Sequence, residues 1–186
     1  MERFLEPVSH TLERYNLNPN LITLLGLIIT LVSAFFYSKG YFLVGGIILI
    51  VGGICDLIDG NLARVSGKVS RFGGFLDSTV DRLSDSAIFV GLSLYAFDNR
   101  DKEFLFLSLL ALIVSYTISY LRARAECIIE SCKVGIMERA ERIILIIIAS
   151  FFNFMKLALI LIVIFGSITI VQRIHHTYKS TINSND

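Results

Sequence analysis

Four aspartates fall at helical spacing within one stretch of the chain: Asp56 and Asp59, followed by Asp77 and Asp81. The members of each pair are three or four residues apart, so each pair lies on one face of a helix, and the intervening loop allows the two pairs to converge. Ionised carboxylates at membrane depth are costly and indicate a functional site, with a metal ion as the natural counter-charge. Oxygen ligands favour a hard cation, Mg²⁺ or Mn²⁺. The four aspartates therefore predict a divalent-metal site.

A structural alternative is that these acids form salt bridges with nearby cationic residues, which are Arg64, Lys68, Arg71 and Arg82. Salt bridges would offset the cost of the buried charges without any metal. Four acids at paired helical spacing exceed what helix packing needs. We therefore favour the metal site.

Small residues surround the acids. Gly60 and Ala63 flank Asp59, and Gly73 opens the second acidic stretch. Small side chains allow a ligand or a second helix to approach the backbone closely. Arg64 is at a suitable depth to meet a phosphate, although its side chain could instead extend to the membrane interface.

The elements that position these residues are predicted to be membrane helices. The 186-residue chain is 54% hydrophobic and 18% charged, with a mean hydropathy of +0.70. These values are outside the range of an ordinary soluble domain. Apolar segments long enough to cross a bilayer occur at about 20–38, 41–65, 73–97, 104–126, 138–153 and 155–173. The sequence predicts an all-α integral membrane protein with six transmembrane helices.

The organisation expected from these segments is a single transmembrane domain over residues 1–186. Residues 1–16 carry their apolar side chains on about one face, which predicts an amphipathic helix along the membrane interface. The six-helix bundle occupies 20–177, and 178–186 reads as a polar, frayed tail. Of the 17 Lys and Arg residues, thirteen fall on the side of the termini and four on the other side. By the positive-inside rule, the termini and the loop near residues 64–72 face the cytoplasm.

The spacing of the acids and small residues forms a known signature. The segment from Asp56 to Asp81 resembles the D-x-x-D-G-x-x-A-R-x8-G-x-x-x-D-x-x-x-D signature of the CDP-alcohol phosphotransferase family, and all eight fixed positions match. The six-crossing layout is also similar to that family along nearly the whole chain. The resemblance implies an enzyme that displaces CMP from a CDP-linked alcohol with a second alcohol.

The resemblance also implies roles for the signature residues. Two Mg²⁺ or Mn²⁺ ions would be held by Asp56, Asp59 and Asp77, with Asp81 as a further ligand or as the general base; the family assigns that base role to the last acid. The CDP group would be bound by the following residues: Asp56, Asp59, Gly60, Ala63, Arg64 and Gly73. The active site would face the cytoplasm at the cell membrane.

A second polar cluster bears on the identity of the accepting alcohol. It comprises Arg122-Ala-Arg124 and, further on, Glu138-Arg139-Ala140-Glu141-Arg142. One interpretation is a pocket in which guanidinium groups bind a phosphorylated acceptor. The alternative is a positive-inside loop with Glu–Arg pairs three residues apart.

The same cluster resembles the branch of the family that uses inositol phosphate, the phosphatidylinositol phosphate and archaetidylinositol phosphate synthases. On that resemblance the acceptor phosphate is held by Arg139, Arg142, Arg124, Arg122 and Arg173, with Arg139 and Arg142 the foremost candidates. Bacterial members usually have proline where Ala140 stands, which favours CDP-archaeol over CDP-diacylglycerol as the lipid donor.

Other functions remain open on the sequence alone. The same chemistry could use glycerol 3-phosphate, serine or another alcohol. Intramembrane aspartates also occur in divalent-cation transporters, but the opposite halves of these segments are apolar. A structural or assembly protein is a third class. The expected partners are membrane lipids and, from the family resemblance, a second copy of the chain in a homodimer; no nucleic acid is expected.

Overall fold

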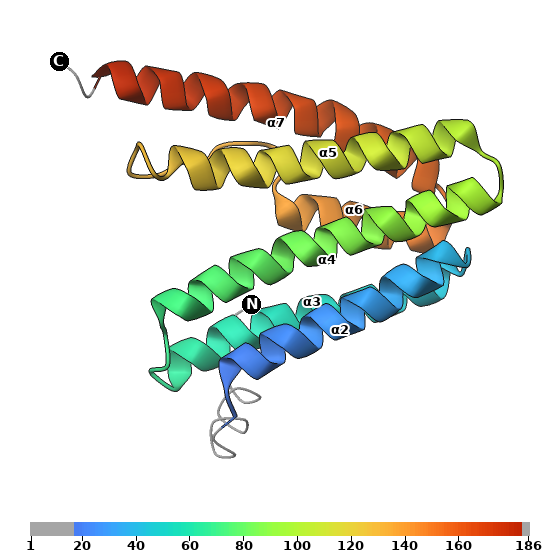
Figure 1. Ribbon diagram of the computed structural model, residues 1–186, viewed down its shortest axis with the longest axis horizontal. Coiled ribbons are helices and arrows are strands. Elements are labelled where there is room, and N and C mark those ends of the chain that lie inside the picture. The colour runs from blue at the N-terminus through green and yellow to red at the C-terminus, as the bar shows by residue number, and fades with distance from the viewer. Residues whose placement is uncertain (1–16, 184–186) are drawn as a thin grey trace. The chain divides into compact units, whose positions relative to one another are not determined.

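The computed structural model describes residues 17–183, and within that range it contains six α-helices and no β-strand. The helices are α2 (Pro19–Ser38), α3 (Phe42–Val65), α4 (Arg71–Asp98), α5 (Lys102–Ala125), α6 (Arg139–Phe152) and α7 (Met155–Asn183). Figure 1 shows their order along the chain. The predicted interfacial helix at 1–16 lies outside the described residues. The chain divides into two helical units, which meet within α4 at Ile88 and Phe89.

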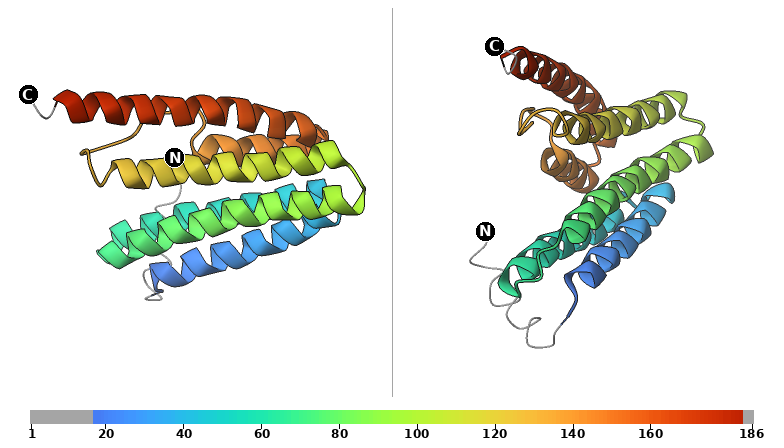
Figure 2. Two further views of the ribbon diagram at one scale, coloured as in Figure 1. Left: turned by 45° about the horizontal axis from the view of Figure 1, so that its top comes forward. Right: turned by 60° about the vertical axis from the view of Figure 1, so that its left-hand side comes forward.

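The first unit is built on an antiparallel pair of helices, α2 and α3, which run side by side (Figures 1 and 2). The pair packs closely because of small residues: a Cβ added to Gly52 would lie 2.9 Å from Thr30 Oγ1. Ser33 Oγ also donates a hydrogen bond to the carbonyl of Gly45 at 2.7 Å. Close backbone approach of this kind is typical of helix pairs in membranes.

Local signals in the sequence explain where these helices begin. At the start of α2, the side chain of Asn18 accepts a hydrogen bond from the backbone N–H of Asn20 at 3.0 Å, and Pro19 occupies the first turn. The turn before α4 contains Gly67 with φ of +64°, and Ser70 Oγ then accepts from the N–H of Gly73 at 2.9 Å. This turn reverses the chain directly after the first pair of aspartates.

The second unit contains the end of α4 together with α5, α6 and α7. Asp101 caps α5 by accepting a hydrogen bond from the N–H of Phe104 at 3.0 Å. α5 packs along α7, where Gly166 faces Val114 so closely that a Cβ would overlap the valine side chain. α6 ends at Phe152, and its C-cap residue Asn153 has the left-handed conformation, with φ of 55° and ψ of 37°.

Four of the helices are long and apolar enough to cross a membrane: α2, α3, α5 and α7. The six predicted apolar segments are all helical. However, α4 is not apolar enough and α6 is not long enough to be counted with these four. α4 has 28 residues and carries the charged residues of the acidic stretch. α6 has 14 residues, or about 21 Å of helix, against a hydrocarbon core of about 30 Å.

α7 is longer than its predicted span. It continues through Asn183, so residues 178–183 are helical where we expected a frayed tail. Within this extension, the Thr177 and Thr181 hydroxyls donate to the carbonyls of Arg173 and Thr177, both at 2.8 Å. Neither glycine nor proline interrupts the segment, and the helix therefore propagates beyond the apolar stretch.

Candidate active site

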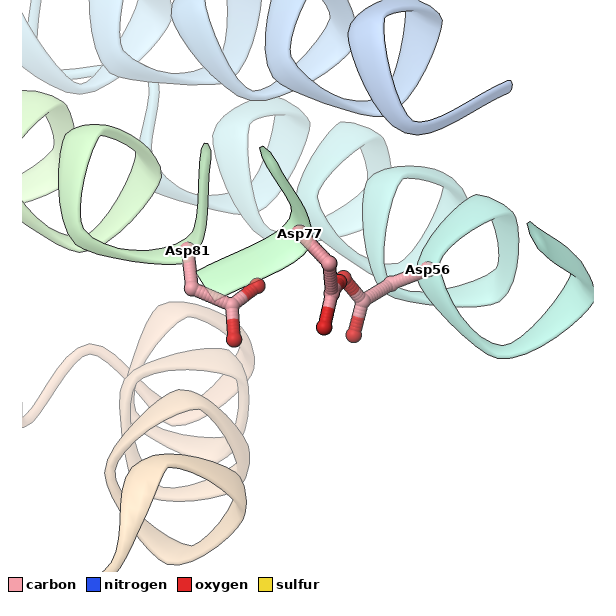
Figure 3. Close-up of side chains that lie close together, drawn as sticks. All are labelled: Asp56, Asp77 and Asp81. Atoms are coloured by element: carbon pink, nitrogen blue, oxygen red, sulfur yellow. The ribbon is translucent and has the colours of Figure 1, made fainter. Parts of the chain in front are cut away.

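Three of the predicted acids form one group in the first unit. α3 carries Asp56, while α4 carries Asp77 and Asp81 one turn apart, and each residue offers a carboxylate oxygen within 4.8 Å of the others. Figure 3 shows the Asp56 and Asp77 carboxyl groups next to each other, with Asp81 turned toward the same side. All three are partly exposed. The predicted convergence of the two acidic pairs is therefore seen for these residues.

Asp59 is placed differently from the other three. It lies one turn after Asp56 on α3, is only 5% exposed, and is not part of the 4.8 Å group. Thr23 of α2 lies beside its carboxyl group, and the charges of Asp56 and Asp77 act on it. Its Oδ2 atom is buried and has no hydrogen-bond partner within the described part of the chain.

These features fit a divalent metal ion. Carboxylates this close repel one another, and a cation removes the repulsion and balances the charge of a buried carboxylate oxygen. The donors are all hard oxygen atoms, which suit Mg²⁺ or Mn²⁺ better than zinc. Asp56, Asp77 and Asp81 could hold such an ion, and a cation could also stabilise the buried Oδ2 of Asp59.

The small residues predicted to line the CDP group lie on the same two helices. Gly60 is open, with no neighbouring atom within 4 Å of where its Cβ would be. Ala63 is half-buried and Arg64 is exposed near the end of α3. Gly73 faces α2: a Cβ there would lie 3.4 Å from Asn20 Oδ1.

The first turn of α2 thus approaches the acidic site through Asn20 and Thr23, which the sequence analysis did not single out. In the sequence, Asn18-Pro19-Asn20 indicates only where a helix begins. It carries no information about how close Asn20 and Thr23 lie to α4. Only the pairing of α2 with α3 brings these polar side chains to the site.

Arg173 of α7 is one of two predicted phosphate-binding arginines that are almost fully buried, together with Arg142. Arg173 is 2% exposed. Its Nη1 donates to the Ile118 carbonyl at 2.6 Å, its Nε to the Val134 carbonyl at 2.9 Å, and its Nη2 to Glu138 Oε1 at 3.4 Å. Arg173 therefore joins α7 to α5 and to the loop before α6.

Arg122 belongs to the same cluster through a shared carboxylate. Its Nη1 lies 4.0 Å from Glu138 Oε2, and its Nε lies 3.1 Å from Oε1 of Glu126, the C-cap residue of α5. These Glu–Arg pairs differ from the pairs three residues apart that the loop alternative expected. They connect residues four positions apart and residues from different segments.

The other predicted arginines occupy three different environments. Arg124 is exposed and borders a cavity of about 300 Å³ between the ends of α5 and α7, which Arg173 also lines. Arg139 is half-buried at the first position of α6. Arg142 is only 1% exposed, and its Nη1 donates to the Met137 carbonyl at 3.2 Å.

The fold and the site together define a multi-pass, all-helical membrane protein with a carboxylate site suited to a hard cation. A family model described as CDP-alcohol phosphatidyltransferase matches residues 16–172. The chain belongs to this family, as the eight-residue signature predicted.

Similar proteins agree with this placement. Archaetidylinositol phosphate synthase of Pyrococcus horikoshii is 44% identical over 94% of this chain and 91% of its own length. A crystal structure of Mycobacterium tuberculosis phosphatidylinositol phosphate synthase with CDP-DAG bound is 33% identical, with a TM-score of 0.88 over 96% of this chain and 95% of that chain. A second structure of that enzyme, in complex with manganese and citrate, is 31% identical, with a TM-score of 0.87 over 95% and 90% of the two chains.

These comparisons confirm two predictions. The chain is an enzyme, a transferase of phospholipid biosynthesis, and it resembles the inositol phosphate branch of the family. The manganese in the related structure agrees with the expected preference for a hard divalent ion. The individual roles of the aspartates and arginines stay predictions.

Proposed function

We propose that the protein transfers an archaetidyl or phosphatidyl group from a CDP-linked lipid to inositol phosphate and releases CMP. The observation that carries this proposal is the group of three carboxylates within 4.8 Å, at the signature positions of the family. The acceptor is inferred from relatives that are named as synthases of inositol phosphate lipids. Among the two donors, the 44% identity to the archaeal enzyme favours CDP-archaeol.

In this proposal, Asp56, Asp59 and Asp77 hold two Mg²⁺ or Mn²⁺ ions, with Asp81 as a further ligand. Bound ions would supply positive charge that neutralises the diphosphate of the donor. The buried Oδ2 of Asp59, which has no hydrogen-bond partner in the described part of the chain, supports its inclusion, because a nearby cation would offset the cost of burying a carboxylate oxygen.

Asp81 acts as the general base. As the acceptor hydroxyl oxygen forms its bond to the donor phosphorus, the Asp81 carboxylate takes up the hydroxyl proton, and the bond from phosphorus to the CMP oxygen breaks. Asp81 follows Asp77 by one turn of α4 and is partly exposed, so its carboxylate can meet an incoming hydroxyl.

The CDP group is bound along α3 and the start of α4. The open space above Gly60 and the half-buried Ala63 leave room for the nucleotide beside the backbone of α3. Arg64 pairs with phosphate oxygens, and Gly73 contributes to the CDP site at the start of α4, where its lack of a side chain lets Asn20 of α2 lie close by. Asp56 and Asp59 contribute to the same site through the ions they hold.

The acceptor phosphate is bound in the second unit by Arg139, Arg142 and Arg124, with contributions from Arg122 and Arg173. A cavity of about 300 Å³ is bordered by Arg124 and Arg173 and supports a ligand site beside these two residues. Guanidinium groups bind phosphate oxygens through paired hydrogen bonds, and they remain charged at any physiological pH.

We further propose that all six helices cross the cell membrane as one domain over residues 1–186, with residues 1–16 along the interface and the active site facing the cytoplasm. The family match over 16–172 supports the single domain. The excess of Lys and Arg on the side of the termini supports the orientation. A homodimer is the expected assembly.

The decisive experiment measures CMP release by the purified full-length protein with Mg²⁺ or Mn²⁺. CDP-archaeol and CDP-diacylglycerol serve as donors, and inositol phosphate, inositol, glycerol 3-phosphate and serine serve as acceptors. We expect release only with inositol phosphate. Release with another acceptor would replace the acceptor assignment, and cation flux into liposomes without any CMP release would contradict the enzyme.

A further inference from the structure

Glu138 lies between two of the arginines assigned to the acceptor phosphate. Its Oε1 is 3.4 Å from Arg173 Nη2, and its Oε2 is 4.0 Å from Arg122 Nη1. A second carboxylate, Glu126, is 3.1 Å from Arg122 Nε. Two guanidinium groups are thus matched by two carboxylates of the protein itself. An incoming phosphate meets a site that already contains anions.

The contact between Arg173 and Glu138 differs from the other contacts of the same guanidinium group. The two hydrogen bonds to backbone carbonyls, at 2.6 and 2.9 Å, are shorter and involve groups fixed by α5 and by the loop at Val134. The contact to Glu138 is longest, at 3.4 Å, and the glutamate side chain is 37% exposed whereas that of Arg173 is 2% exposed. Glu138 is therefore the partner of Arg173 that can move away at least cost.

The Glu138 carboxylate is not held in place by the helix that Glu138 caps. Glu138 is the N-cap residue of α6, with φ of −74° and ψ of −172°, yet its side chain accepts no hydrogen bond from the first turn of that helix. An N-cap side chain normally binds those N–H groups. Among the contacts of Glu138 in the described segment, the carboxylate is held by the arginines alone.

We propose that Glu138 is a specificity-determining residue: its carboxylate occupies the place of the acceptor phosphate at Arg173 and Arg122, and leaves when a phosphorylated acceptor binds. This inference rests on the proposed function, since it takes the acceptor to be phosphorylated. A phosphomonoester carries about −1.5 to −2 charges at pH 7 and can replace a singly charged carboxylate. A neutral alcohol brings no anion, so displacing Glu138 would leave the buried Arg173 uncompensated. Glu138 therefore selects against unphosphorylated acceptors.

The test replaces the carboxylate with an amide of the same size. Glu138→Gln removes the charge, but its amide oxygen can still accept a hydrogen bond from Arg173. We expect inorganic phosphate to bind the full-length protein about threefold more tightly, measured by titration calorimetry in lipid nanodiscs, and the KM for inositol phosphate to fall by a similar factor. The KM for the CDP-lipid should not change.

Glu126→Gln is the matched control, because it removes the same charge beside Arg122 without touching Arg173. Its effect on phosphate affinity should be less than about twofold. Glu138→Asp is a second variant, since it keeps the charge but draws the carboxylate away from Arg173, and its phosphate affinity should lie between those of the wild type and the Gln variant.

The inference is overturned if phosphate binds Glu138→Gln no more tightly than it binds Glu126→Gln, or if both Glu138 variants bind it more weakly than the wild type. A purely structural role for Glu138 would lower the melting temperature of the Gln variant and leave phosphate affinity unchanged. The phosphate titration needs no turnover. If the proposed function is wrong, the CMP-release assay will instead show turnover with another acceptor, or no turnover with any acceptor.

Discussion

Arg173 Nη1 lies 2.6 Å from the carbonyl oxygen of Ile118, so that a side chain of α7 is anchored on the backbone of α5. The same guanidinium group reaches the loop before α6 at Val134 and Glu138. A single buried cation thus holds three segments of the second unit together. This relationship gives Arg173 a structural role in addition to the ligand role assigned to it.

Replacing Arg173 by alanine should lower stability substantially. The change removes two hydrogen bonds to backbone carbonyls and a charged contact, and each hydrogen bond to a charged group contributes about 1.5–3 kcal/mol. We expect a loss of about 3 kcal/mol or more, seen as a lower melting temperature in nanodiscs. Gln172→Ala changes the neighbouring exposed residue of α7 and should have little effect. A melting temperature for Arg173→Ala equal to that of this control would contradict the anchoring role.

Removal of one carboxylate from the acidic group should weaken cation binding. A cation present at 100 times its Kd stabilises the folded state by about 2.7 kcal/mol, and a tenfold rise in Kd lowers this by about 1.4 kcal/mol. We expect Asp77→Asn to lose at least this much of the thermal stabilisation by Mn²⁺ or Mg²⁺. Asp98→Asn alters an exposed carboxylate at the end of the same helix and should retain it. Equal stabilisation of the two variants would argue against a metal site that includes Asp77.

Asp81→Asn should separate proton transfer from ligand binding. An amide of the same size cannot accept the hydroxyl proton, and the loss of a general base lowers turnover by about 10² to 10⁴-fold. We expect CMP release to fall by this factor while CDP-lipid still binds, as measured by calorimetry with the purified variant. Turnover close to that of the wild type would remove the base role from Asp81.

Asp101 predicts a pH dependence of stability at the start of α5. The pKa of Asp101 is lowered below its ordinary value of 3.8. Its carboxylate accepts a hydrogen bond from the N–H of Phe104, and the ammonium group of Lys156 lies 3.2 Å away. A carboxyl group with a lowered pKa in the folded state contributes stability above its unfolded pKa, and this contribution is lost as the pH falls through the folded pKa.

The corresponding variant is Asp101→Asn, which keeps a cap oxygen but no charge. Its melting temperature should fall less than that of the wild type between about pH 5 and pH 3. Asp98→Asn, at an exposed carboxylate three residues earlier, should follow the wild type. Parallel curves for wild type and Asp101→Asn would show that Asp101 does not contribute to the pH dependence.

The positions of the helices followed closely from the sequence, because hydropathy and caps act locally. The six apolar segments are all helical, and α2 begins at Pro19, within one residue of the predicted start near residue 20. The lengths of the helices followed less closely from the sequence, because the end of a helix depends on its packing against other helices and on its last hydrogen bonds. α6 has 14 residues, fewer than a typical membrane-crossing helix, and α7 runs on to Asn183.

The sequence by itself determined the family, because eight residues at specified spacing identify it. It also predicted the acidic site, because spacings of three and four place acids on one helical face. Only the tertiary structure decided that Asp59 is buried apart from the group formed by Asp56, Asp77 and Asp81. It also decided that Arg173 binds backbone carbonyls and that Glu138 stands among the arginines. These contacts join residues up to 55 positions apart. Local periodicity does not encode such distances, since they depend on how whole helices pack.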